Sequence, residues 1–483
     1  MAALIMGHKL TMAYSDLQDY LRCLETDGKL HWVDKPVDPS WEVSAVTRHL
    51  FDGYGWNDRP ALGFRHVGDS PFPLVIGVIG GSPQIYALAL STTPDKIPEV
   101  WEKGQRHPID PTTVKSGLCK EIIARGAEVD LGTLPQVVWT PGQDPGPYIT
   151  APVIITKDVE TGRRNVGTYR LQIKGPGQLG LYVGAAQHAA KHIRQYEAQK
   201  QDMPLAIAIG VDPTIVLASI SKFPYGTDEI SVAGGLRGEP VPLVPCETVD
   251  LDVPANAEIV IEGFLRCGYR EQEGPFGEFS GYMSPGGQQP VIEVTCMTRR
   301  RAPVYHSFLS QMPPSESSCI RSLSRSAALF HHLRYVIGLP VRDVHFTESG
   351  GASGMLVVSM KKEYPEQVKE VAWGAWSLMN KECKFTIVVD DDIDVRNPFQ
   401  IEWAMSFHAQ PARDTFIVSG VVPSGVDPST APSDLPQHDP RRRAGSKMLI
   451  DATRKHPYPP VARVPAEYIQ AAQKKWKEYG FSK

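Results

Sequence analysis

The sequence has little net charge and no long uninterrupted hydrophobic run. Its 50 Lys and Arg residues are nearly balanced by 54 Asp and Glu residues, which leaves a formal net charge of -4. Such a chain lacks the strong field that attracts nucleic acid or an anionic membrane surface. No run reaches the roughly 18 apolar residues of a transmembrane helix, and the apolar part of MAALIMGHKL is too short for a signal peptide. We therefore expect a cytoplasmic protein with no nucleic-acid or membrane partner.

Patterned cysteines and common metal or nucleotide motifs are also missing. The seven cysteines are scattered and include no C-x-x-C pair, which argues against a disulfide framework or a zinc cluster. His188 and His192 have the i, i+4 spacing of two helical metal ligands, but Ala189 stands where the H-E-x-x-H motif of zinc proteases needs glutamate. No P-loop is present. A zinc hydrolase is therefore disfavoured.

The length of the chain and its many glycines and prolines predict more than one domain. A chain of 483 residues with 42 Gly and 42 Pro exceeds one ordinary core and favours a loop-rich α/β (α+β) fold. We expect an N-terminal α/β region over residues 1–115, opened by an amphipathic helix with a Ser15/Gln18 capping box. Short strand-like runs predict a β-rich central domain over 116–320, with the form of a barrel. Alternating strand and helix patterns over 321–483 predict a C-terminal α/β domain.

The stretch REQEGPFGEFSGY holds two glutamates, Glu273 and Glu278, on either side of a Gly-Pro-Phe-Gly turn. If the turn directs both side chains into one pocket, repulsion between the two carboxylates raises the pKa of one of them while the other stays ionised. The carboxyl with the raised pKa can then act as an acid near neutral pH. The alternative is a solvated acidic loop, since glutamate is mostly a surface residue. Spacing alone favours the solvated loop.

The upstream stretch NVGTYRLQI places Asn165 and Arg170 near one strand. An arginine fork is suited to a substrate carboxylate, although a surface strand arginine fits the pattern equally well. Because the two residues are an odd number apart, a bulge or a strand end must intervene if both serve one site. One histidine of the helix that follows, with Asn165 and Glu229, would form an oxygen-rich site suited to Mn²⁺ or Mg²⁺ and phosphate oxygens.

Two further segments carry charged candidates. The run VVDDDIDV puts Asp390, Asp391, Asp392 and Asp394 at the end of an apolar strand, where a metal site for phosphotransfer and a helix-capping acidic turn are both possible. In RRRAGSKMLIDAT, Lys447 lies near three arginines, which suits a phosphate or cofactor contact or a solvated basic turn.

Taken together, NVGTYR, AQH, YGTDEISVAGGLRGEPVPLVPCET, EGPFGEFSGY, VVDDDIDV and GSKMLIDAT, in this order, resemble the UbiD family of decarboxylases that depend on prenylated FMN. The resemblance covers nearly the whole chain. It implies a central split β-barrel that binds the flavin, a C-terminal oligomerisation domain, and reversible, non-oxidative loss of CO₂ from an aromatic or heteroaromatic acid. It also implies a homodimer or homohexamer and a flavin prenyltransferase as the source of the cofactor.

The resemblance also assigns roles to residues. Arg170 would hold the substrate carboxylate and support Glu273, while Glu278 would protonate the carbon that CO₂ has left. Asn165, His188 and Glu229 would hold Mn²⁺ or Mg²⁺, usually with K⁺ nearby. Positions that match the lining of the cofactor are Gln187, Ser219, Ser221 and Lys447. His192 and the Asp390–Asp394 run become structural.

The substrate is less well defined by the same resemblance. The segments NVGTYR and MPLAIAIGVDP are most similar to members that act on phenolic benzoates such as 4-hydroxybenzoate or vanillate. The segment PVYHSFLSQMPPSESS, in which His306 and Gln311 could reach a ring substituent, differs from those members. A pyrrole, furan or indole acid, or a substrate with a second carboxylate, therefore stays open. Other classes also stay open: a phosphotransferase using the Asp390–Asp394 run, and a flavin-binding protein without catalysis.

Overall fold

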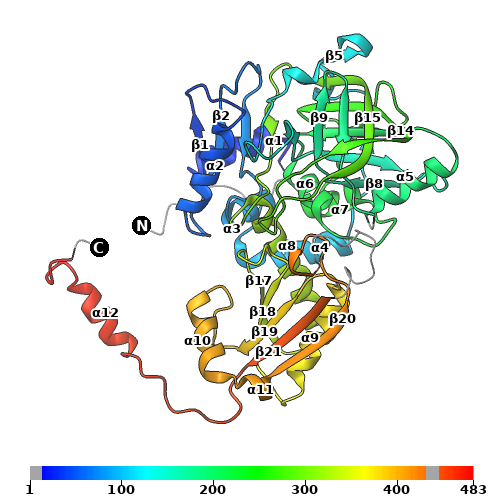
Figure 1. The fold of residues 1–483 in the computed structure, drawn as a ribbon. Coiled ribbons are helices and arrows are strands. Elements are labelled where there is room, and N and C mark those ends of the chain that lie inside the picture. Colours follow the sequence, from blue (N-terminus) through cyan, green and yellow to red (C-terminus); the bar gives the residue numbers. More distant parts are fainter. Residues whose placement is uncertain (1–13, 186, 431–444, 482–483) are drawn as a thin grey trace.

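The computed structural model describes residues 14–185, 187–430 and 445–481. Figure 1 shows the N-terminal elements beside a β-rich central part, with a C-terminal α/β part below them. The predicted mixed α/β class is confirmed. No helix within the described ranges is long and apolar enough to cross a membrane.

The N-terminal part contains α1 (Leu17–Thr26), β1 (Leu30–Val33), α2 (Glu42–Gly53), β2 (Ala61–Phe64), β3 (Leu74–Ile76), α3 (Pro83–Ala89) and α4 (Ile97–Arg106). Its sheet has the order β1-β2-β3-β16. The last strand, β16 (Tyr305–His306), comes from a distant part of the chain and pairs in parallel with β3. The segment around His306 is therefore anchored in the N-terminal sheet.

Helix α1 forms as its apolar spacing predicts, but its capping differs. The N-cap is Asp16, whose side chain accepts a hydrogen bond from the backbone N–H of Asp19. The predicted Ser15/Gln18 capping box is wrong, because Gln18 instead donates a hydrogen bond of 2.9 Å to the carboxylate of Glu258. Aspartate is as good an N-cap as serine. The apolar stripe is buried, and its members are Leu17, Tyr20, Leu21 and Leu24.

A nine-stranded sheet forms the central part. Its main path runs β6-β9-β10-β15-β14-β11-β7-β8, and β5 pairs with β15. The end strands β6 and β8 do not pair with each other, so the described strands do not close into the barrel that the sequence predicts. The strands are β5 (Ile122–Arg125), β6 (Tyr148–Ile149), β7 (Val153–Lys157), β8 (Arg164–Gly167), β9 (Leu171–Gly175), β10 (Gln178–Leu181), β11 (Met203–Ile209), β14 (Ile259–Glu273) and β15 (Gly287–Arg299).

Three helices and a small sheet complete this part. They are α5 (His188–Ala198), α6 (Pro213–Ile220) and α7 (Glu229–Arg237), with β4 (Thr112–Thr113), β12 (Pro242–Pro245) and β13 (Asp252–Pro254). Two glycines interrupt the sequence of α7, which hides its helical pattern. They permit close packing on α4, since a Cβ on Gly235 would lie 2.5 Å from the carbonyl oxygen of Gly104.

The C-terminal part is a five-stranded sheet with the order β17-β18-β19-β21-β20. Its elements are β17 (Val341–Phe346), β18 (Met355–Met360), α9 (Gln367–Leu378), β19 (Phe385–Asp390), α10 (Pro398–His408), α11 (Pro411–Asp414), β20 (Thr415–Val421) and β21 (Gly445–Ala452). Beyond β21 the chain leaves this part and ends in α12 (Ala466–Lys474), which buries no side chain (Figure 1).

Helix α8 (Glu316–His331) joins the two main cores. Ile320 packs in a core shared by the N-terminal and central parts, whereas Leu329 and the nearby Leu333 pack in the C-terminal core. At the start of α8, the fully buried Glu316 carboxylate accepts backbone hydrogen bonds of 2.7, 3.1 and 3.1 Å from the loop at residues 77–80. This carboxylate therefore pins α8 to the N-terminal part.

Replacing Glu316 tests this anchor. Glu316→Ala leaves the loop N–H groups buried without an acceptor, so we expect the free energy of unfolding to fall by about 3 kcal/mol. Urea denaturation followed by circular dichroism measures the change. The control Asp250→Ala, at a side chain that is 98% exposed, should shift it by less than about 0.5 kcal/mol. Equal midpoints for the two variants would show that the carboxylate does not anchor the helix.

Candidate active site

Arg170 connects the two glutamates of the REQEGPFGEFSGY segment. Its Nε and Nη2 atoms donate hydrogen bonds of 2.8 and 2.9 Å to the two carboxylate oxygens of Glu273. Its Nη1 donates a 2.7 Å hydrogen bond to Oε1 of Glu278, and Nη2 also reaches the Ser284 hydroxyl at 3.1 Å. One guanidinium thus holds both carboxylates, and the paired fork on Glu273 fixes its plane.

Strand ends bring these residues together. Arg170 lies in the link between β8 and β9, so the strand end that its spacing from Asn165 requires is present. Glu273 is the last residue of β14, and Glu278 lies in the following turn. That turn is closed by hydrogen bonds from the Glu278 N–H to the Tyr282 carbonyl and from the Ser284 N–H to the Phe276 carbonyl. The backbone, and not a helical repeat, therefore aims the two carboxylates.

The network is shielded from water. Glu273 is fully buried, and the side chains of Arg170 and Glu278 are only 8% and 16% exposed. The ring of Tyr182 lies 4.0 Å from the guanidinium carbon of Arg170, and the ring of Phe276 lies 4.8 Å from it. The alternative of a solvated acidic loop is therefore wrong, because neither glutamate faces bulk solvent.

Burial separates the electrostatic roles of these groups. Desolvation raises the pKa of Glu278 above its ordinary value, and the positive charge of Arg170 offsets only part of this effect. Burial alone would lower the pKa of Arg170, but its hydrogen bonds and charge interaction with Glu273 raise it above the usual value. Arg170 thus stays charged, while Glu278 is able to carry a proton nearer neutral pH.

The three predicted metal ligands lie on three different elements of the central part. Asn165 lies on β8, His188 begins α5, and Glu229 begins α7. The Glu229 carboxylate accepts a 2.8 Å hydrogen bond from the backbone N–H of Val166, next to Asn165. Burial raises the pKa of the Tyr169 hydroxyl, and the negative charge of Glu229 adds to this rise, so Tyr169 lies near Glu229. The structure therefore brings β8, α5 and α7 to one place.

The chemistry of this group fits a divalent cation. Burial raises the pKa of Glu229 to about 7, the effect that a nearby cation would reverse. Burial also lowers the pKa of His188, which keeps its imidazole neutral and able to ligate. The side-chain amide nitrogen of Asn165 is buried without a hydrogen-bond partner. Within the described residues, no three His, Cys, Asp or Glu side chains lie close enough together to hold a metal ion by themselves.

His192 has a different environment from His188. Its ring nitrogens pair with the Thr156 hydroxyl at 2.9 Å and the Tyr225 hydroxyl at 3.2 Å, as a structural histidine does.

The predicted cofactor-lining residues occupy several positions. Gln187 is exposed and accepts a 2.6 Å hydrogen bond from the Gly184 N–H. Ser219 pairs with the Thr168 hydroxyl at 2.8 Å, next to the Arg170 segment, whereas Ser221 donates to the Leu217 carbonyl of its own helix. Lys447 lies on β21 in the C-terminal part.

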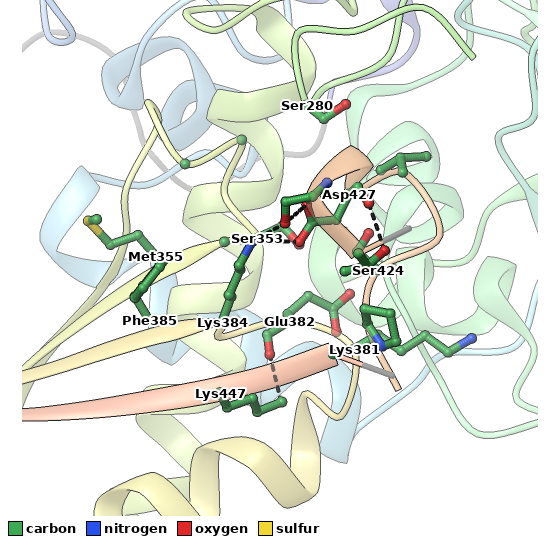
Figure 2. Close-up of a pocket in the computed structure, with 18 of the residues that line it drawn as sticks. Ser280, Ser353, Met355, Lys381, Glu382, Lys384, Phe385, Ser424, Asp427 and Lys447 are labelled. Atoms are coloured by element: carbon green, nitrogen blue, oxygen red, sulfur yellow. Dashed lines mark hydrogen bonds and ion pairs between the residues drawn. The ribbon is translucent and has the colours of Figure 1, made fainter. Parts of the chain in front are cut away.

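Lys447 lines a cavity of about 730 Å³ at the C-terminal part. Phe279, Ser280 and Tyr282 bring the turn that carries Glu278 to the same cavity. Figure 2 shows Ser280 on one side of the cavity and Lys447 with Glu382 on the opposite side. The Lys447 amine donates hydrogen bonds to the carbonyls of Glu382 at 2.7 Å and Met379 at 3.1 Å. The cavity thus connects the glutamate turn with the C-terminal part.

The two residues predicted to contact the substrate, Gln311 and His306, lie in different surroundings. Gln311 lies against the turn, since a Cβ on Gly277 would be 3.4 Å from its Cγ, and its amide donates to Thr140 Oγ1 at 3.0 Å. His306 is fully buried on β16, beside the ring of Phe308, and lines neither of the two best-defined cavities. Burial lowers the pKa of His306 to about 3.

The aspartates of the Asp390–Asp394 run form hydrogen bonds and ion pairs within the C-terminal part. Asp390 accepts a 2.9 Å hydrogen bond from Arg454, which also pairs with Asp392, and Asp394 accepts from the backbone N–H of Arg396. Arg454 thus occupies carboxylate oxygens that a metal for phosphotransfer would need. The helix-capping interpretation is wrong as well, because the helix that follows, α10, is capped by the side chain of Asn397 and not by an aspartate of the run.

Sequence patterns missed several residues around Arg170. Tyr182, Phe276 and Ser284 contact its guanidinium. Asp144 lies close enough for the charge of Arg170 to affect its pKa, which burial raises to about 6. Phe276 lies between the two glutamates and Ser284 lies shortly after Glu278, so both could have been found from the sequence around the turn. Tyr182 and Asp144 are distant in sequence and carry no local signal.

Comparisons with known proteins agree with this geometry. Residues 21–103 match the N-terminal domain, 112–313 the Rift-related domain and 318–452 the C-terminal domain described as 3-octaprenyl-4-hydroxybenzoate carboxy-lyase, or UbiD. An uncharacterized protein of Synechocystis is 30% identical, with 96% of each chain covered. The UbiD-class enzyme HmfF of Pelotomaculum thermopropionicum, solved with FMN, is 34% identical, with a TM-score of 0.85 over 95% of this chain and 99% of that chain.

Two solved decarboxylases of aromatic acids are also similar. The vanillic acid decarboxylase of Sedimentibacter hydroxybenzoicus is 28% identical, with a TM-score of 0.83 over 97% of this chain and 99% of that chain. The 3,4-dihydroxybenzoic acid decarboxylase of Klebsiella pneumoniae is 26% identical, with a TM-score of 0.82 over 94% and 99%. The three matched domains and the buried Arg170 network lead to one conclusion: this chain belongs to the UbiD family of carboxy-lyases.

Proposed function

We propose that the protein catalyses the reversible, non-oxidative decarboxylation of an aromatic or heteroaromatic carboxylic acid with prenylated FMN as its cofactor. The observation that carries the proposal is the buried Glu273–Arg170–Glu278 network in a member of this family. Two solved relatives support the cofactor, because HmfF was solved with FMN and an evolved dimeric form of it with prenylated FMN.

The roles of the catalytic residues follow from their contacts. Glu273 holds Arg170 by two hydrogen bonds, so the guanidinium is oriented before the substrate binds. The substrate carboxylate pairs with Arg170 and leaves as neutral CO₂, and the aromatic walls of Tyr182 and Phe276 favour this loss of charge. Glu278, whose pKa is raised, then donates its proton to the ring carbon that has lost CO₂.

Prenylated FMN, when bound, supplies the electron sink for this reaction. Asn165, His188 and Glu229 would hold Mn²⁺ or Mg²⁺, with K⁺ nearby, and the metal would bind the cofactor phosphate. Gln187, Ser219, Ser221 and Lys447 would line the cofactor. The neutral imidazole of His188 and the buried carboxylate of Glu229 support the metal assignment.

The proposal also covers the residues that contact the substrate, the domain bounds, the location of the protein and the source of its cofactor. Gln311 and His306 are the proposed contacts to a ring substituent, and Gln311 has the stronger support because it lies against the glutamate turn. We retain domains at 1–115, 116–320 and 321–483, a cytoplasmic location and a flavin prenyltransferase as the source of the cofactor.

We also propose that the protein forms a homodimer or homohexamer through its C-terminal domain. Helix α12 carries exposed Tyr468 and Ile469, and no side chain of this helix is buried within its own chain. An isolated helix this short is marginally stable in water, so it requires a packing partner. One similar structure, an evolved form of HmfF, is described as dimeric, which supports assembly of this chain.

The decarboxylase proposal is tested with protein co-expressed with a flavin prenyltransferase. We expect the purified protein to contain the modified flavin by mass and absorption spectra, and to release CO₂ from members of a panel of aromatic and heteroaromatic acids. Bound flavin without turnover would indicate a flavin-binding protein. Absence of both the modified flavin and turnover would refute the proposal.

Two variants separate chemistry from cofactor binding. Glu278→Gln removes the proton donor, and we expect product formation to fall by at least about 100-fold while the flavin content is unchanged. His188→Ala removes a metal ligand, and we expect it to lose both metal and flavin, as measured by elemental analysis and absorption. His31→Ala, at an exposed histidine on β1, is the control and should keep both. Loss of flavin from the Glu278 variant would contradict the proposed division of roles.

Removal of the C-terminal segment after residue 462, which contains α12, tests the assembly proposal. A chain ending at residue 462 lacks α12 and its exposed apolar side chains, and we expect it to form smaller oligomers than the full chain. Light scattering coupled to size-exclusion chromatography measures the mass. As a matched change within the full chain, Tyr468→Glu should weaken assembly, while Lys474→Glu should not. An unchanged mass for both the truncated chain and Tyr468→Glu would exclude a role for α12.

A further inference from the structure

Arg321 lies beside the proton-donating turn but has no role in the mechanism described above. It is near the start of α8, and its guanidinium carbon lies 4.0 Å from the ring centre of Phe279, the residue after Glu278. Stacking on an aromatic face fixes the plane of a guanidinium and leaves its edge N–H groups free to donate. Arg321 is therefore a preorganised cation next to the site.

Arg321 is largely shielded from solvent and has no acidic partner among the described residues. Its Nη1 is inaccessible to solvent and has no hydrogen-bond partner, and no carboxylate within the described residues lies in ion-pair contact with it. Other buried arginines are paired. Arg59 forms two hydrogen bonds of 2.7 and 2.8 Å with Glu348, and Arg325 lies 3.3 Å from Glu382. Since a buried unpaired charge is costly, this arrangement favours an anionic ligand.

Arg321 remains charged near neutral pH. Burial and the neighbouring charge of Arg325 lower its pKa to about 10, while Glu278 and Glu382 act in the opposite direction. Glu278 lies near enough for its charge to act on Arg321 but forms no ion pair with it, whereas it accepts a hydrogen bond of 2.7 Å from Arg170. Two cations, Arg170 and Arg321, therefore flank the Glu278 carboxylate.

The position of Arg321 suits contact with a substrate. Phe279 both stacks on Arg321 and lines the 730 Å³ cavity, so the guanidinium lies one side chain from that space. Arg170 is the proposed partner of the carboxylate that is lost. A second arginine at the other side of Glu278 can bind a carboxylate that is retained, through the same two-point geometry.

We propose that Arg321 recognises a second acidic group on the substrate, so that the preferred substrates are aromatic or heteroaromatic dicarboxylic acids. This inference rests on the proposed decarboxylase function. Arg170 would bind the departing carboxylate, Glu278 would protonate the vacated carbon, and Arg321 would hold the carboxylate that stays on the ring. Arg321 is thus a residue that determines specificity and takes no part in proton transfer.

Matched pairs of acids test the inference on the protein loaded with its cofactor. Benzoate is compared with 1,3- and 1,4-benzenedicarboxylate, and pyrrole-2-carboxylate with pyrrole-2,5-dicarboxylate. We expect kcat/KM of the wild type to favour the diacid by at least about 10-fold. Arg321→Gln should reduce this preference by about 10-fold or more through the diacid alone, and Arg321→Lys should have an intermediate effect. Arg342→Gln, at a half-exposed surface arginine, is the control.

Calorimetry of the same acids with the Glu278→Gln protein, alone and combined with Arg321→Gln, gives a readout that does not need turnover. We expect the diacids to bind more weakly when Arg321 is replaced, and the monoacids to bind equally. A loss that is the same for monoacids and diacids, or an unchanged preference, would overturn the inference. If no acid is decarboxylated, the proposed function fails, and the calorimetric difference alone still decides whether Arg321 binds a second carboxylate.

Discussion

The paired hydrogen bonds between Arg170 and Glu273 are the interaction on which the rest of the site depends. A fully buried carboxylate needs hydrogen-bond donors that replace water, and Arg170 provides them for Glu273 with two donors at 2.8 and 2.9 Å. The third donor is then directed at Glu278, which has no comparable second partner. The same cation therefore binds both oxygens of one glutamate and only one oxygen of the other.

Helix α8 links this network to the rest of the molecule. It is anchored at its start by Glu316, contributes to both main cores, and places Arg321 against the aromatic ring next to Glu278. The turn that carries Glu278 also borders the cavity of the C-terminal part. Any displacement of the C-terminal part relative to α8 would therefore change the surroundings of the proton donor, although the Arg170–Glu273 pair would stay within the central sheet.

Prediction from the sequence succeeded where the signal was local. The apolar stripe of α1, the strand and helix alternation of the C-terminal part, and the strand end between Asn165 and Arg170 all follow from periodicity. It failed where a distant residue competes for a local partner. The Ser15/Gln18 capping box is absent because Gln18 binds Glu258, and α7 was overlooked because its glycines serve close packing on α4.

The sequence alone determined the family, through the order and composition of its motifs, and the identity of the residues that can carry the chemistry. Only the tertiary structure decided that Glu273 and Glu278 are buried on one arginine, that His306 lies in the N-terminal sheet, and that Arg321 has no acidic partner among the residues that the structure describes. The physical reason is that burial and pairing are properties of contacts between distant segments. Residue types and spacings specify which contacts are possible, and packing selects which of them form.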